Sequence, residues 1–187
     1  MRKPIITFGL TLFVSVFVFA QEQPKRVTSL VDSTYQNELV LIQEFIVEAP
    51  VNSVWDAYTT KEGWENWSVP IAEVDLRIGG TIKTNYNPNG RIGDSTTIVT
   101  NIVNYVPLRL ITLQAELTDN FPEFMKKEAK NFYNVIYFDE VEPGRTHVKS
   151  FGIGYRNTPK YMNLMKFFIP ANEKTLSKLI AYLEDLK

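Results

Sequence analysis

The sequence predicts an α+β fold: an antiparallel sheet of about six to seven strands, covered by a long C-terminal helix. Segments rich in β-branched and aromatic residues recur between residues 38 and 155 with turn signals between them, the pattern of consecutive antiparallel strands. The longest apolar stripe at helical spacing follows near the C-terminus. A sheet must bury one of its faces, and this stripe marks the one long helix available to cover it.

The N-terminus predicts a signal peptide. Arg2 and Lys3 precede an uncharged run, residues 5–20, that ends in Val-Phe-Ala, which is the order of a secretory signal. An uncleaved membrane anchor is the alternative, but the run is shorter than the ~20 apolar residues that a spanning helix needs. We therefore expect a signal peptide over 1–20, cleavage after Ala20, and an exported protein, periplasmic or secreted, with no stable membrane insertion after cleavage.

The domain that follows is expected over 38–187. Residues 21–37 before it are polar and without a clear period, so they are interpreted as a tether. The run from Glu38 to Ala49 is apolar and β-branched, which predicts a strand that Pro50 ends. Helical spacing then predicts two short helices, over 51–59 and 61–67.

The remaining elements complete the sheet and cover it. Six further strands are predicted, over 72–78, 81–86, 95–106, 108–117, 132–141 and 146–155. Residues 119–130 interrupt them as a short helix with Pro122 in its first turn. The terminal helix is expected from Pro159 to Lys187, and Pro170 is expected to kink it or break it in two.

Composition excludes several classes of function. The 187 residues contain no cysteine and one histidine, so disulfides, a thiolate nucleophile and Cys-ligated or His-rich metal sites are excluded. The formal net charge of −1 argues against a nucleic-acid partner, because phosphate binding needs a basic surface. We expect no cofactor.

Two motifs resemble a known family. The run EAPVNSVWDAYTT over 48–60 is similar to the opening signature of the START-like helix-grip superfamily (SRPBCC), in the branch named for the activator of Hsp90 ATPase. The run DLRIGG over 75–80 resembles a strand and turn of that branch. The resemblance covers about 44–187 and implies a curved antiparallel sheet wrapped around the C-terminal helix. Members commonly hold a hydrophobic ligand between sheet and helix. Some are enzymes, some are carriers and some stimulate a chaperone ATPase.

No catalytic or metal-binding pattern stands out. His147 lies in a predicted strand beside Lys149 and is interpreted as a solvated strand histidine, because a general base needs a partner within hydrogen-bond reach. Residues 87–94 carry oxygen ligands but lack the spacing of an EF-hand, so they are interpreted as a hairpin turn.

A cavity between sheet and helix is the strongest functional prediction. One face of the last strand carries small residues, among them Ser150, Gly152 and Gly154, which either let the helix approach closely or leave a void. The family resemblance favours a void, and a packed core is the alternative. The lining residues predicted for it are Trp67, Thr84, Tyr86, Phe132, Ile136, Ser150, Met165 and Ile169.

Three functions are compatible with these features. The first is an exported protein that holds a small hydrophobic or amphipathic molecule in the cavity. The second is an enzyme that uses the same cavity, with Asn134, Thr84 and Tyr86 polarising its substrate. The third is a protein-interaction module like the chaperone activators. The insertion over 119–130 is either a lid on the cavity or a surface loop.

Overall fold

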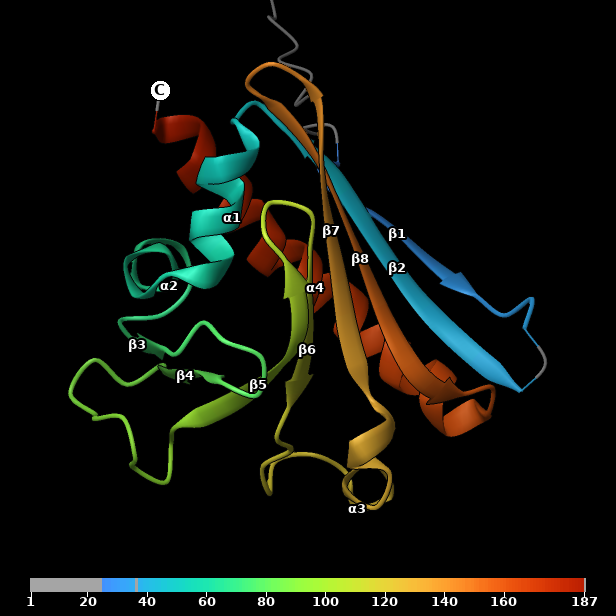
Figure 1. The fold of residues 1–187 in the computed structure, drawn as a ribbon. Coiled ribbons are helices and arrows are strands. Elements are labelled where there is room, and N and C mark those ends of the chain that lie inside the picture. Colours follow the sequence, from blue (N-terminus) through green and yellow to red (C-terminus); the bar gives the residue numbers. More distant parts are fainter. Residues whose placement is uncertain (1–24, 36, 187) are drawn as a thin grey trace, which may run out of the picture.

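Eight antiparallel strands form one curved sheet, and a long C-terminal helix crosses one of its faces (Figure 1). The computed structural model describes residues 25–35 and 37–186. The strand order is β1-β2-β8-β7-β6-β5-β4-β3. In chain order the elements are β1 Thr28–Asp32, β2 Glu38–Val47, α1 Val51–Thr59, α2 Lys61–Trp67, β3 Ile71–Val74, β4 Thr81–Asn85, β5 Ile98–Val106, β6 Leu110–Ala115, α3 Glu123–Lys126, the 3-10 turn η1 Ala129–Asn131, β7 Tyr133–Glu142, β8 Arg145–Arg156 and α4 Pro159–Asp185.

The predicted fold class is confirmed, and one strand is added to it. Residues 28–32, inside the segment interpreted as a tether, form the edge strand β1 and pair with β2, with Leu30 opposite Ile42. Val27 just before β1 is only 1% exposed. The strand escaped the sequence argument because it has five residues and polar neighbours on both sides. The predicted signal peptide lies outside the described residues.

The two faces of the sheet are set by strict alternation along the strands. In β2 the side chains of Leu39, Leu41, Phe45 and Val47 are buried on the face that α4 covers, which we call the inner face. The side chains between them lie on the opposite, outer face.

The core under α4 consists of two clusters. The larger one joins α1, α2 and the C-terminal half of α4 to the sheet, and Phe138 is its fully buried centre, with ring contacts to Trp55 and Tyr58. The smaller one lies at the other end of α4 and contains Leu39, Met125, Phe132 and Tyr161. The two clusters are separate, and the rows of side chains between them form the candidate site described below.

Of the two outcomes expected at Pro170, a kink or a break of the C-terminal helix, the break is wrong. Helix α4 is continuous over 159–185, and Pro170 is exposed on its surface. Proline removes one backbone hydrogen bond from the helix. The buried side chains of Met165 on one side and Leu179 on the other hold both halves against the inner face. Packing therefore outweighs the local cost of the proline.

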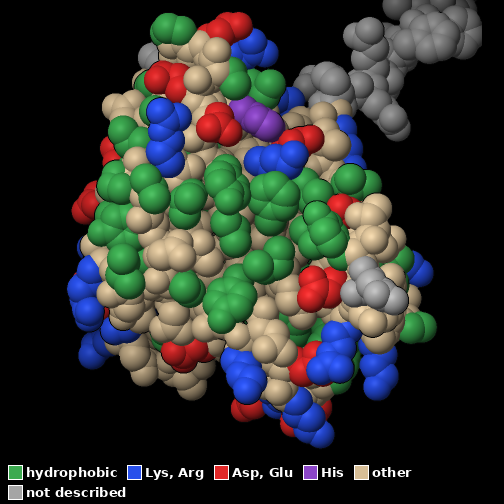
Figure 2. All heavy atoms as spheres, turned by 45° about the vertical axis from the view of Figure 1, so that its right-hand side comes forward, with side chains coloured by type: hydrophobic (Ala, Val, Ile, Leu, Met, Phe, Trp, Pro, Cys, Tyr) green, Lys and Arg blue, Asp and Glu red, His purple; other side chains and the backbone are tan. Residues whose placement is uncertain are grey.

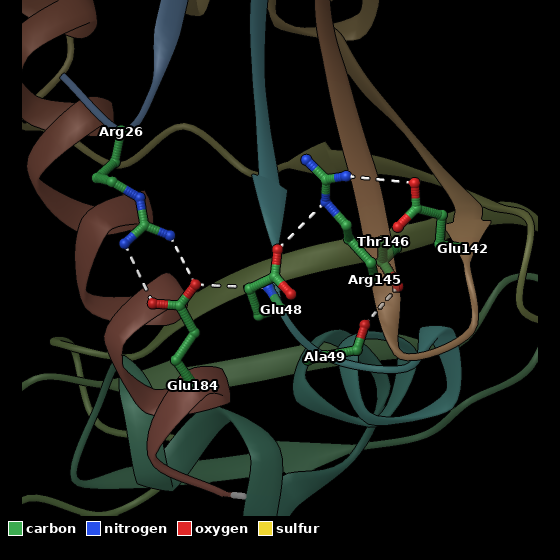
Figure 3. Close-up of polar contacts among 7 residues, drawn as sticks. All are labelled: Arg26, Glu48, Ala49, Glu142, Arg145, Thr146 and Glu184. Carbon is green, nitrogen blue, oxygen red and sulfur yellow. Dashed lines mark hydrogen bonds and ion pairs between the residues drawn. The ribbon is translucent and has the colours of Figure 1, made fainter. Parts of the chain in front are cut away.

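A polar cluster joins residues near both ends of the described part of the chain (Figure 3). The Arg26 guanidinium forms two hydrogen bonds, of 3.1 and 2.6 Å, with the Glu184 carboxylate near the end of α4. The buried Thr146 hydroxyl at the start of β8 donates to the Ala49 carbonyl over 2.7 Å. Nε of Arg145 lies 3.2 Å from Oε1 of Glu48, so the two side chains form an ion pair, although the Nε–H is not aligned for a hydrogen bond. The contact between Arg26 and Glu184 holds the residues just before β1 against the last turns of α4.

Candidate ligand pocket

A partly open cavity of about 220 Å³, with Ala115 and Asn134 exposed at its lining, lies on the inner face between the two core clusters. The register shows why it falls there. In β2 the order is Leu39 of the smaller cluster, then Leu41 and Gln43 at the cavity, then Phe45 of the larger cluster. Strands β7 and β8 repeat this order. The lining consists of Leu41, Gln43, Ala115, Leu117, Phe121, Met125, Phe132, Tyr133, Asn134, Ser150, Gly152, Tyr155, Phe168 and Asn172.

Small residues in the middle of β8 leave this space open. Gly152 lies opposite Leu41 on one side and opposite Asn134 on the other. A Cβ atom at Gly152 would lie 3.3 Å from the Tyr155 ring and 3.5 Å from Cβ of Leu41, so any longer side chain would occupy the cavity. Ser150, the next inward residue, is also small. The void that was predicted from the small-residue face is therefore present at Ser150 and Gly152.

Gly154 does not belong to that small-residue face, contrary to the sequence prediction. The β2–β8 register shifts between Leu39 and Leu41, and Gly154 has a φ of +91°, which side-chain-bearing residues rarely adopt. The bulge turns Tyr155 to the inner face, where its ring stacks on Phe132 with centroids 5.0 Å apart. A large aromatic wall thus stands where an open surface was expected.

The insertion over 119–130 closes one end of the cavity. Phe121 and Met125 line it, and Met125 is 2% exposed. Glu128 fastens the segment to the domain, because its carboxylate accepts hydrogen bonds of 2.9 Å from both Arg156 and the Tyr161 hydroxyl. Burial, together with that hydrogen bond, raises the pKa of Tyr161 to about 12. The insertion therefore covers part of the cavity in this structure, as a lid would.

Four polar side chains interrupt the apolar lining, and they come in two hydrogen-bonded pairs. The Ser150 hydroxyl donates to Oδ1 of Asn134 over 2.7 Å. Nδ2 of Asn172 donates to Oε1 of Gln43 over 2.8 Å. Burial raises the pKa of Tyr155 to about 12, so its phenol stays neutral at physiological pH. Among the described residues, no charged side chain lines the cavity.

The predicted lining residues separate into three groups. Phe132 and Ser150 line the cavity, whereas Met165 and Ile169 of α4 do not line it and are buried and half-buried, respectively. Trp67 and Ile136 belong to the larger cluster. Thr84 is buried on β4, and Tyr86 beyond its end is 61% exposed.

Four lining residues of β2 and α4 were not predicted from the sequence. Strand β2 was recognised, but its inward residues Leu41 and Gln43 were not assigned to the site. On α4, Phe168 and Asn172 are one helical turn apart, so they share a face that the periodicity of the helix could have revealed.

His147 and Lys149 lie on the outer face, on both sides of a carboxylate. Oε2 of Glu44 is 3.3 Å from Nε2 of His147 and 3.4 Å from Nζ of Lys149. The three side chains lie on the outer face, so the sheet separates them from the cavity. Within 25–35 and 37–186, no group of three or more Asp, Glu or His side chains is placed to hold a metal ion.

The outer face carries an apolar patch of its own. One row crosses four strands, because Leu30, Ile42, Phe151 and Val135 are register neighbours. Figure 2 shows it as a green area below the single histidine, drawn in purple. A shallow hollow of about 480 Å³ lies over it. We call Leu30, Val40, Ile42, Val135, Tyr137, Phe151 and Ile153 the outer-face patch. This hollow is larger than the cavity but has only the sheet as a wall.

No helix in the described part of the chain is both long enough and apolar enough to span a membrane.

Comparisons with known proteins place the fold. A search of the curated proteins finds no significant match. Among solved structures, the Aha1 dimer from Colwellia psychrerythraea is 18% identical, with a TM-score of 0.58 over 78% of this chain and 96% of that chain. A protein from Nitrosomonas europaea is 21% identical, with a TM-score of 0.59 over 79% and 96%. CalU16 from Micromonospora echinospora is 16% identical, with a TM-score of 0.58 over 84% and 85%.

The family described as "Activator of Hsp90 ATPase homolog 1-like protein" matches residues 48–184, from the end of β2 to the last turns of α4. This stretch includes both motifs on which the resemblance was based and most of the cavity lining. The chain belongs to the family of activator of Hsp90 ATPase homolog 1-like proteins.

Proposed function

We propose that this protein is an exported binding protein that holds a small amphipathic molecule in the cavity between the sheet and α4. The observation that carries the proposal is the partly open space between the two core clusters, where the close packing typical of protein interiors is interrupted. The lining is mostly apolar with a few convergent polar groups, as in known ligand sites. An engineered apolar cavity of about 150 Å³ binds benzene, so about 220 Å³ suits one ring with a small head group.

The polar groups of the cavity support binding more than catalysis. Asn134, Gln43 and Asn172 are amides, which do not take up or release protons at physiological pH. Tyr155 has a raised pKa, so its phenol stays protonated at neutral pH and is not available as a general base. Thr84 and Tyr86, the partners proposed for Asn134 in an enzyme, do not line the cavity. An enzyme that acts in this cavity is therefore the weaker alternative.

Export is part of the proposal, and its support is the charge and hydropathy pattern of residues 1–20. N-terminal sequencing of the protein from the cell envelope or the medium tests it. A mature chain that begins at Gln21 is expected, and a chain that keeps Met1 would contradict export.

Filling the cavity is expected to abolish binding. In Ser150→Leu the added carbons enter the space beside Asn134 and leave no room for a ring. The probe is 4-fluorotoluene, observed by ¹⁹F NMR, and we expect its line broadening to disappear in the variant. The matched control is Lys149→Leu, at the residue of β8 directly before Ser150. Its side chain lies on the outer face, so the line broadening of the probe should remain. Equal broadening in wild type and Ser150→Leu would place the probe outside the cavity and contradict the proposal.

A protein-interaction module is a second candidate function, and the outer-face patch favours it. Leu30 is 58% exposed and Tyr137 41% exposed within the outer-face patch, and an exposed apolar patch often marks a contact surface. Because the relative from Colwellia psychrerythraea is described as a dimer, a second copy is the first partner to test. Light scattering of wild type and Phe151→Lys over a range of concentrations would show whether the patch mediates self-association. If the wild-type protein is a monomer at every concentration, self-association through the outer-face patch is excluded.

A further inference from the structure

We propose that the cavity selects an uncharged head group that both donates and accepts hydrogen bonds, such as a primary amide or an alcohol, and rejects a carboxylate. The proposal rests on the function proposed above and adds the chemical class of the ligand. It follows from the directions of the hydrogen bonds around the cavity, taken one at a time.

A chain of polar contacts leads from the surface to the cavity wall on α4. It begins at Glu173, whose carboxylate is 2.8 Å from Nζ of Lys25 and accepts a hydrogen bond of 2.6 Å from the Ser29 hydroxyl. Burial by itself would raise the pKa of Glu173, but these two contacts outweigh it and hold the pKa below its ordinary value. Glu173 is therefore ionised at neutral pH, and an ionised carboxylate can only accept hydrogen bonds.

This acceptor sets the direction of every later hydrogen bond in the chain. Since the single proton of the Ser29 hydroxyl goes to Glu173, its oxygen accepts from Nε2 of Gln43, at 3.0 Å. Oε1 of Gln43 then faces α4 and accepts from Nδ2 of Asn172, at 2.8 Å. Gln43 is only 3% exposed, so turning its amide around would leave a buried donor facing another donor.

Asn172 therefore presents an acceptor to the cavity. Its amide nitrogen gives one of its two protons to Gln43, and the acceptor that it offers to a ligand is the carbonyl oxygen Oδ1. The opposite wall of the cavity presents hydrogen-bond donors. The Ser150 hydroxyl donates to Oδ1 of Asn134, which leaves Nδ2 of Asn134 as a donor, and the neutral phenol of Tyr155 is a second one.

A ligand head group has to match both walls. A primary amide or an alcohol can donate to Asn172 and accept from Asn134 or Tyr155. A carboxylate has no proton for Oδ1 of Asn172, and its charge would lie against a lining whose described residues include no cation. Wherever that lining removes it from water, an unpaired charge costs more than a hydrogen-bonded neutral group.

The test compares four ligands that share one ring: 4-fluorotoluene, 4-fluorobenzyl alcohol, 4-fluorobenzamide and 4-fluorobenzoate, titrated into the full chain at neutral pH and followed by ¹⁹F NMR. We expect the amide and the alcohol to bind at least about tenfold more tightly than the benzoate, the ratio that corresponds to 1.4 kcal/mol, roughly one hydrogen bond. Equal affinities, or tightest binding of the benzoate, would overturn the proposal while leaving the proposed function intact. If none of the four ligands binds, both the head-group selectivity and the proposed function are contradicted.

Two variants test the role of the hydrogen-bond chain. Ser29→Ala removes the link between Glu173 and Gln43, so the amides of Gln43 and Asn172 lose their fixed orientation. We expect the preference for amide over benzoate to fall severalfold while the affinity for 4-fluorotoluene is unchanged. The matched control is Ser177→Ala on α4, whose hydroxyl donates to the helix backbone at Glu173 and is not part of the chain. A preference that is unchanged in Ser29→Ala would show that the chain does not set the head-group selectivity.

Discussion

Replacement of Gly154 by alanine is expected to destabilise the domain by about 3 kcal/mol or more. Two costs add at this position. A residue with a side chain at a φ of +91° is strained by about 1–2 kcal/mol. A Cβ atom there would also overlap the carbonyl group of Asn131 at the end of the insertion, so the backbone of one segment has to move. The bulge that presents Tyr155 to the cavity would be lost with it.

Gly144 is the matched control for this substitution. It lies in the turn between β7 and β8 with a φ of +79°, but no atom lies within 4 Å of a Cβ built there. Gly144→Ala should therefore show the conformational cost alone, about 1–2 kcal/mol. Urea unfolding of both variants, followed by circular dichroism, measures the difference. Equal losses would mean that the close approach of Gly154 to Asn131 contributes nothing.

Removal of the first strand is expected to cost several kcal/mol as well. A chain over 34–187 lacks Val27, whose burial stabilises the fold by about 1.5–3 kcal/mol. It also lacks Ser29, so the buried amide of Gln43 loses its acceptor at a cost of about 1–3 kcal/mol. Its urea midpoint should lie well below that of a chain over 21–187. If residues 21–37 are only a tether, the two midpoints will coincide.

Two point variants test whether the buried side chains of this segment account for its contribution to stability. Val27→Ser replaces a side chain that is 1% exposed and should cost about 2 kcal/mol. Leu30→Ser makes a similar change of chemistry at a side chain that is 58% exposed on the outer face, and should stay within about 0.5 kcal/mol. Equal losses from the two variants would contradict the assigned register of β1.

Periodicity predicted the elements of this fold well because each long strand and helix carries its own signal. The alternation of β2 and the apolar stripe around Leu179 and Leu183 depend only on which residues face the core. Two features were not predicted, and both are stabilised by contacts with parts of the chain that are distant in sequence. Strand β1 is too short to show alternation, and α4 continues through Pro170 because contacts with the sheet hold it.

The candidate site was harder to predict, for a similar reason. Ser150 and Phe132 could be assigned because a small-residue face and an aromatic strand are visible in the sequence. Thr84, Tyr86 and Trp67 were chosen from the same fold but lie elsewhere, since strand order alone does not show where along α4 the core divides. Gln43 and Asn172 meet only because β2 and α4 pack together across 129 positions of sequence.

The most direct test of the account locates a bound molecule on one face of the sheet. With methyl-labelled protein and 4-fluorobenzamide, intermolecular nuclear Overhauser effects can be measured to single side chains. We predict contacts with the methyl groups of Leu41 and Met125, which line the cavity. Contacts with Ile42 and Val135 of the outer-face patch, or none with Leu41 and Met125, would contradict a binding site between the sheet and α4.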